Sequence, residues 1–173
     1  LFKIKNSKIE SKVKIIGFDK GFDNDEQKTI ILAKANMLIY LSDLVKNNRN
    51  LTKEFARVFN ETFKLQTWTL WTLANVWDKE EDKFDLIITN PPYVTSWSSI
   101  LKDEIKESTD LQDFYRVNGM WVEWLAIEWI VNKLKKSWKA FIVVPDWIFN
   151  RLNDNKLRRF ILENCYINWV ISL

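Results

Sequence analysis

The residue types best suited to chemistry lie in one short run, Asn90-Pro91-Pro92-Tyr93, directly after a strand expected over residues 83–89. Phe84, Leu86, Ile87 and Ile88 form a short apolar run in it that does not alternate with polar residues, which is typical of a strand buried on both faces. The two prolines lack N–H groups and fix their own φ angles, so the strand must end where they begin. An amide, two carbonyls and an aromatic ring are therefore held at the carboxyl end of a strand, the edge at which α/β sheets bind ligands. Such a set can accept hydrogen bonds from a planar group and stack against it.

This run resembles the catalytic motif of the S-adenosylmethionine-dependent amino-methyltransferases, above all the DNA adenine-N6 methyltransferases. The wider stretches over residues 90–96, 118–120 and 139–146 are similar to the modification subunit of type I restriction systems. The resemblance extends from about Lys14 to the last residue. It implies that Asn90, Pro91, Pro92 and Tyr93 form the catalytic motif.

The chemistry of amine methylation explains these residue types. An exocyclic adenine amine is a poor nucleophile, because its lone pair is delocalised into the ring. If the Asn90 side-chain oxygen and the Pro91 carbonyl each accept one N–H, the nitrogen can aim its lone pair at a methyl group, and preorganised acceptors stabilise the developing charge. Tyr93 offers a stacking face, a contact that contributes about 1–3 kcal/mol per base. The target base must be flipped out of the duplex to reach it.

A plain turn is the alternative interpretation of Asn-Pro-Pro-Tyr, since such dipeptides punctuate many chains. The position after a buried strand, in a chain of alternating strands and helices, favours the methyltransferase interpretation instead.

The expected cofactor is S-adenosylmethionine. Asp19 ends a strand expected over residues 13–18, and in doubly wound folds an acidic residue at the end of the second strand accepts the ribose hydroxyls. A turn residue in a polar stretch is the alternative for Asp19. The resemblance also implies cofactor contacts from Thr72, Leu73 and Asn90. Position 71 is Trp where the family usually carries an acidic residue, so that contact is missing.

The elements that must position these residues alternate in type. The strand over residues 139–144 is again expected to be fully buried, and Asp146 follows it at the edge that borders the target base in the resembling family. Residues 94–117 lack a clean period and are expected to form a substrate-facing loop. The remaining expectations are helices over 25–46, 51–63, 121–136 and 153–164, and strands around 70–76 and over 167–173.

This order predicts an α/β fold with a doubly wound, mostly parallel sheet. The resemblance implies a Rossmann-like S-adenosylmethionine-dependent methyltransferase fold. Upstream of Val13 there is no Gly-rich turn to cradle the methionine part of the cofactor. Residues 1–173 are therefore expected to be a partial catalytic domain, an internal fragment without its first and last strands, that binds the cofactor weakly by itself.

Composition adds few constraints. The chain has 173 residues, 26 basic and 23 acidic, so its net charge of +3 does not by itself indicate nucleic acid. One cysteine excludes an internal disulfide framework and, with no signal peptide and no long apolar run, predicts a cytoplasmic protein without a membrane segment. No His is present, and no metal site is expected. The resemblance implies DNA as partner, with specificity and restriction subunits as further candidates.

The proportion of tryptophan to glycine is abnormal, with ten Trp and three Gly. Trp138 lies between an expected helix and strand, where a left-handed Gly is usual. Trp147 follows Pro145-Asp146, a sequence that Gly completes as a turn. We hypothesise that the gene reads UGA as glycine and that every Trp except Trp129 stands at a glycine position. The alternative is a Trp-rich surface that stacks on bases. The nine positions are Trp68, Trp71, Trp77, Trp97, Trp121, Trp124, Trp138, Trp147 and Trp169.

Three functions remain open on the sequence. The first is DNA adenine-N6 methylation in a restriction-modification system. The second keeps the chemistry but acts on a protein glutamine or on RNA, because those methyltransferases also carry Asn-Pro-Pro-Tyr and a side-chain amide presents the same planar N–H pair. The third is an inactive remnant that serves only as a DNA-binding or assembly module.

Overall fold

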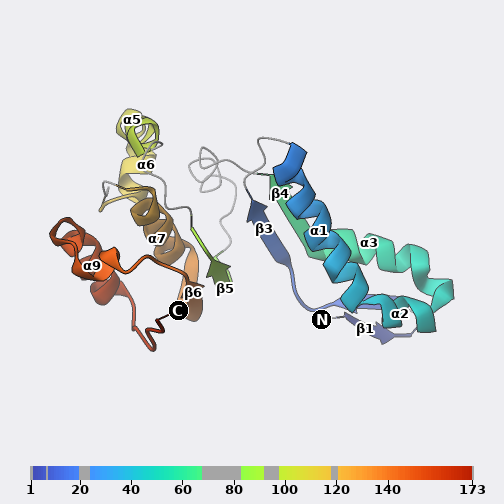
Figure 1. The fold of residues 1–173 in the computed structure, drawn as a ribbon. Coiled ribbons are helices and arrows are strands. Elements are labelled where there is room, and N and C mark those ends of the chain that lie inside the picture. Colours follow the sequence, from blue (N-terminus) through green and yellow to red (C-terminus); the bar gives the residue numbers. More distant parts are fainter. Residues whose placement is uncertain are drawn as a thin grey trace. The chain divides into compact units, whose positions relative to one another are not determined.

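The computed structural model describes residues 2–6, 8–19, 24–67, 83–91, 98–117 and 121–172. They fall into two compact units, Leu1–Thr72 and Leu73–Leu173. Each unit combines helices with short strands (Figure 1). The fold is therefore mixed α/β, and the two units are described separately below.

The first unit contains an antiparallel hairpin and a parallel strand pair. Strands β1 (Phe2–Lys5) and β2 (Lys8–Ser11) form the hairpin. Strand β3 (Ile15–Asp19) pairs in parallel with β4 (Phe63–Thr67), in a register that places Asp19 opposite Thr67. Between these strands the chain forms α1 (Asn24–Tyr40), α2 (Ser42–Asn47), the 3-10 helix η1 (Arg49–Leu51) and α3 (Thr52–Thr62).

Helix α3 supplies most of the core of this unit. Its buried residues are spaced by three and four, which places them on one face. The Phe59 ring lies 4.8 Å from the Phe63 ring and 5.8 Å from the Phe55 ring, centroid to centroid. Arg57, on the exposed face, pairs with Glu54 at 2.7 Å and Glu61 at 2.8 Å. The buried core residues are Ile9, Phe55, Val58, Phe59 and Phe63.

The helix predicted over residues 25–46 is interrupted at Leu41. The chain turns there, and α1 ends one residue before it. Met37, Leu41 and Leu44 pack against the core as their spacing predicts. Ile31 and Ile39, by contrast, lie on an exposed part of α1, so this helix is apolar on more than the predicted face.

The second unit is built on another parallel pair, β5 (Phe84–Thr89) and β6 (Leu134–Ile142). The register is irregular at the start, because Phe84 is opposite Leu134 while Leu86 is opposite Lys139. Strand β6 has extra residues at this irregularity, and Ser137 among them has a φ of 70°. The helices of this unit are α5 (Ser98–Glu107), α6 (Thr109–Phe114), α7 (Val122–Lys133), α8 (Trp147–Asn150), η2 (Leu152–Asp154) and α9 (Asn155–Asn164).

Helix α7 is the centre of the second unit. It is buried at every position from Val122 to Ile130, and it contacts both β6 and α9. Its Trp129 ring lies 5.9 Å from the ring of Phe84 on β5. A core cluster joins α7 to α8 and α9, and its buried members are Trp124, Ile127, Ile148 and Leu157.

The prediction that β5 is buried on both faces is wrong for this chain. Ile87 is only 9% exposed, whereas Leu86 is 51% and Ile88 73% exposed. Strand β6 differs in the same way, since it begins at Leu134 and is largely exposed. The reason is that, within the described residues, the sheet has only two strands, and too little packs on it to cover Leu86 and Ile88.

Three further predictions about elements need correction. Residues 98–114 form α5 and α6 instead of a loop. The sequence offers Asn153 or Asp154 as the cap of the last helix; Asp154 is at the N-cap position of α9, but its carboxylate is turned to Arg151, with Oδ2 3.1 Å from Nε, and makes no capping hydrogen bond. Residues 165–172 have no regular secondary structure, where a final strand was expected. The strand expected around 70–76 lies outside the described residues, and β3 instead pairs with the earlier β4.

Candidate active site

Asn90 and Pro91 lie at the carboxyl end of β5. Pairing with β6 continues to the residue before them, since the Val143 N–H donates to the Thr89 carbonyl at 3.0 Å. Pro91 has no N–H and cannot continue the ladder. Asn90 is exposed, whereas Pro91 is buried. The motif is therefore anchored by its proline, with the amide residue on the solvent side.

Asp146 lies beyond the same edge of this sheet. Since β5 and β6 are parallel, their carboxyl ends meet at one edge, and Asp146 follows β6 by four residues. Asp146 is exposed and precedes α8, and its side chain makes no capping hydrogen bond there. Its backbone carbonyl accepts from the Phe149 N–H at 3.0 Å. The structure thus brings Asn90, Pro91 and Asp146 to one edge of one sheet.

The other candidate residues are less fully placed. Asp19 is the last residue of β3, at the carboxyl end of the parallel pair in the first unit. Pro92, Tyr93, Thr72 and Leu73 lie outside the described residues.

A buried polar cluster on α7 escaped the sequence predictions. Glu128 is fully buried, and its Oε1 accepts the Val117 N–H at 2.6 Å. One turn later, the Asn132 Nδ2 donates to the Phe114 carbonyl at 2.7 Å. Burial, and secondly the charge of Glu128, raise the pKa of the Tyr115 hydroxyl between these two contacts. Only the acidic residue in an apolar helix was a signal, because the partner of Glu128 is 11 residues away and that of Asn132 is 18 residues away.

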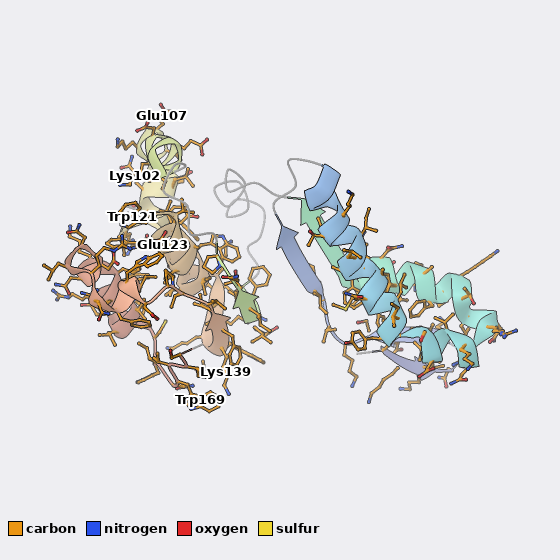
Figure 2. All side chains as sticks on the ribbon, viewed as in Figure 1. Lys102, Glu107, Trp121, Glu123, Lys139 and Trp169 are labelled. Atoms are coloured by element: carbon orange, nitrogen blue, oxygen red, sulfur yellow. The ribbon has the colours of Figure 1, made fainter. Side chains whose placement is uncertain are left out.

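A second polar cluster joins the segment after β6 to the start of α7. The Arg151 guanidinium lies 3.1 Å from Asp154 and 3.6 Å from Glu123, and both carboxylates are buried. It also lies over the rings of Trp121 and Trp147, 5.0 Å and 5.8 Å from their centroids. Figure 2 shows Trp121 and Glu123 close together at the beginning of α7.

The sequence also suggests a DNA-facing patch around the last predicted helix, made of Arg151, Lys156, Arg158 and Arg159. Two of these four residues hold the protein itself together. Arg151 makes the contacts above, and Arg158 donates from Nη1 to the carbonyls of Ile148 and Arg151, both at 2.8 Å. Arg159 pairs with Glu163 at 2.7 Å on the surface of α9. For Lys156, the remaining member, the patch stays a prediction.

Comparison with known families decides the membership. The family model "Eco57I restriction-modification methylase" matches residues 4–173. The chain belongs to this family. Membership places the Eco57I-family chain among the methyltransferases of restriction-modification systems, and it agrees with the resemblance found around Asn90-Pro91-Pro92-Tyr93.

Individual relatives add little to the family assignment. A segment of 54 residues, 31% of this Eco57I-family chain, is 37% identical to "Protein Ycf2" of Pinus koraiensis. The segment spans 3% of the length of that protein, so it carries no argument about function. No solved structure matches the chain.

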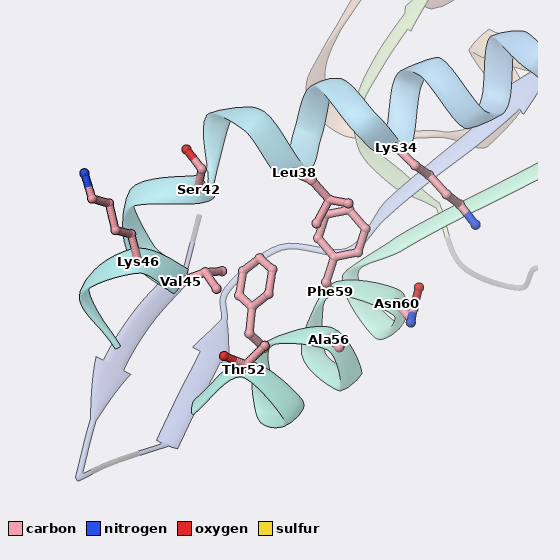
Figure 3. A pocket seen from close by; sticks show the side chains of 10 residues that line it. Lys34, Leu38, Ser42, Val45, Lys46, Thr52, Ala56, Phe59 and Asn60 are labelled. Atoms are coloured by element: carbon pink, nitrogen blue, oxygen red, sulfur yellow. The ribbon is translucent and has the colours of Figure 1, made fainter. Parts of the chain in front are cut away.

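A groove in the first unit of this Eco57I-family chain is not lined by the candidate residues. It has a volume of about 700 Å³ and is lined by residues of α1, α2 and α3, among them Phe55 and Phe59; Figure 3 shows the Phe59 ring projecting into it from α3. Lys34 and Lys46 contribute to its wall. None of the proposed catalytic or cofactor residues lines it.

The described residues contain neither a metal-binding cluster nor a membrane-spanning helix. No group of three or more His, Cys, Asp or Glu side chains is arranged to hold a metal ion there. Among the same residues, no helix is both long and apolar enough to cross a membrane.

Proposed function

We propose that this chain is part of the catalytic domain of a DNA adenine-N6 methyltransferase that acts in a restriction-modification system with S-adenosylmethionine as methyl donor. The observation that carries the proposal is the motif geometry: exposed Asn90 and buried Pro91 at the carboxyl end of a parallel strand, with Asp146 beyond the same sheet edge. Family membership supports the reaction class.

The chain's own residues suit the chemistry of the target amine. The Asn90 amide oxygen and the Pro91 carbonyl accept its two N–H groups, and fixed acceptors need no reorganisation as positive charge builds on nitrogen. The new N–C bond forms as the donor's S–C bond breaks, and the amine then loses a proton to solvent. Tyr93 stacks on the flipped base and Asp146 shapes the pocket around it.

The residues also fit the donor. When bound, S-adenosylmethionine supplies an electrophilic methyl group and leaves as S-adenosylhomocysteine. A carboxylate at the carboxyl end of a parallel strand is suited to ribose hydroxyls, and Asp19 has that position on β3. Thr72 and Leu73 would contact the adenine of the donor, and Asn90 would contribute to the donor site as well.

The proposed architecture is a Rossmann-like, doubly wound sheet of which residues 1–173 form an incomplete part. Two parallel strand pairs, each connected through helices, support it. DNA is the proposed partner, together with specificity and restriction subunits, and the proposed location is the cytoplasm.

Substitution at Asn90 tests the function. In the full-length protein, Asn90→Ala should lower the rate of methyl transfer to plasmid DNA by about 100- to 1000-fold, the usual effect of removing one preorganised transition-state contact. Asn164→Ala, at the exposed end of α9, is the matched control and should keep the parent rate.

Digestion of the product DNA to nucleosides should yield N6-methyladenine. Transfer to a glutamine peptide or to RNA, with none to DNA, would replace the proposal with the alternative amino-methyltransferases. An Asn90→Ala variant with parent activity would remove the motif from the mechanism.

A further inference from the structure

Helix α7 binds the last residues of the segment that connects the catalytic motif to α7. This segment leaves β5 at Asn90, forms α5 and α6, and then enters α7. Near the end of the segment, the backbones of Phe114 and Val117 are hydrogen-bonded by the side chains of Asn132 and Glu128, respectively. The two side chains are one helical turn apart, so they project from the same face of α7. We call these four residues the α7 clamp.

The burial of the Glu128 carboxylate is energetically unfavourable. Glu128 is fully buried in a helix whose neighbouring side chains are apolar, and burial of a carboxylate is unfavourable unless it is hydrogen-bonded. An apolar residue of similar size would fill the same space without that cost. The carboxylate instead makes a short bond of 2.6 Å to a backbone N–H, and hydrogen bonds to charged acceptors are stronger than neutral ones. Its evident contribution is therefore to fix the backbone at Val117.

The same helix also contacts the catalytic strand. The ring of Trp129, the residue after Glu128, lies 5.9 Å from the ring of Phe84 on β5. One rigid element thus contacts the strand that ends in Asn90 and binds the segment that returns from it. A change at the clamp would move that segment relative to the motif without touching either Asn90 or Pro91.

We propose that Glu128 and Asn132 are positioning residues that hold the segment 98–117 in register with Asn90, so that it can engage the DNA strand carrying the target base. The inference rests on the proposed function. It assigns to α7 the alignment of segment 98–117, in addition to its place in the core.

The experiment compares variants of the full-length protein. Glu128→Leu removes the acceptor, whereas Glu128→Gln keeps an oxygen that can accept the Val117 N–H. In Glu128→Leu we expect kcat/KM for DNA to fall on the order of 100-fold, the effect of a small misplacement near the reacting groups, with the KM for S-adenosylmethionine unchanged. Glu128→Gln should recover most of the loss. Asn132→Leu, at a less buried position, should give the same pattern and carries the test if Glu128→Leu does not fold.

A variant at another fully buried carboxylate separates positioning from stability. Asp154→Asn weakens the ion pair with Arg151 and should lower the melting temperature without changing the kinetic constants of the folded enzyme. Hydrogen exchange at the Val117 amide reports the clamp directly and should accelerate in Glu128→Leu but not in Asp154→Asn.

The outcomes remain distinguishable from those of the proposed function. If folded Glu128→Leu and Asn132→Leu show the parent kinetic constants for DNA, or if Glu128→Gln is as defective as Glu128→Leu, the positioning role is overturned. If the parent protein methylates no DNA, the proposed function fails instead, while the exchange of the Val117 amide still shows whether the clamp exists.

Discussion

Tyr115 shows how one buried hydroxyl couples folding to pH. Its side chain is buried beside Glu128, and burial, followed by that charge, raises the pKa of the phenol above its ordinary value of 10.0. The folded protein therefore keeps the Tyr115 proton at a pH where the unfolded chain has lost it. The contribution of Tyr115 to stability is fully present below pH 10 and is lost as the pH rises above that value.

We therefore predict an alkaline loss of stability that depends on Tyr115. Between pH 10 and 11 the free energy of unfolding should fall by up to about 1.4 kcal/mol per pH unit from this group. Urea denaturation of the parent and of Tyr115→Phe at pH 8, 10 and 11 measures the effect. The Tyr115→Phe variant should have a shallower slope, and identical slopes would contradict the assigned burial of the hydroxyl.

At the same scale, the sequence located the motif but not its supporting residues. Asn90 and Pro91 could be found because proline has a local backbone effect that needs no knowledge of neighbours. Glu128 could not be found in this way, because its role depends on a hydrogen bond from the Val117 N–H, 11 residues earlier in the chain. Asp154 is at the predicted N-cap position of α9, but nothing in the local pattern shows that its carboxylate pairs with Arg151 instead of making a capping hydrogen bond.

Elements with a strong apolar period were predicted well. Helix α3 and helix α7 agree with the predicted ranges to within a few residues, as does β5. The segment around α5 and α6 was not predicted, because few of its positions are apolar and Ile105 and Leu111 are the buried ones among those described. A capping signal was nevertheless present, since the Ser108 hydroxyl accepts from the Leu111 N–H at 3.4 Å.

Ile87 and Ile88 on β5 are neighbours of the same type with different exposure, so their truncation should affect stability differently. In this chain Ile87→Ala should lower the free energy of unfolding by about 2–5 kcal/mol, because it leaves a cavity in a packed site. Ile88→Ala should change it by no more than about 0.5 kcal/mol, since Ile88 is exposed. Chemical denaturation of both variants measures the difference. Equal losses would mean that the second face of the sheet is covered as well.

At the scale of the whole molecule, the tryptophans remain the main anomaly. The indole N–H groups of Trp121 and Trp124 are buried and have no hydrogen-bond partner within the described residues, an arrangement that costs free energy. Trp138 directly follows Ser137, whose φ of 70° is in the left-handed region that favours glycine. The described Trp residues themselves all have negative φ. The residue with left-handed φ is thus Ser137, one residue before Trp138, for which it was predicted.

We predict that protein isolated from its natural host carries Gly at these nine positions, encoded by UGA. Peptide mass spectrometry of that protein, together with sequencing of the gene, measures this directly. Trp129, which packs against Phe84, is the internal control and should be Trp encoded by UGG. UGG codons at the other nine positions would show that the tryptophans are genuine.

The two-stranded sheets have a practical consequence for handling this chain. Within the described residues, each strand of the β3–β4 and β5–β6 pairs is hydrogen-bonded to one neighbour. The other edge of such a strand can recruit a strand from a second molecule, and Leu86, Ile88 and Phe141 offer it an apolar face. Concentrated solutions of the isolated chain should therefore self-associate into extended sheets, so a solubility tag and low protein concentration are the conditions in which to study it.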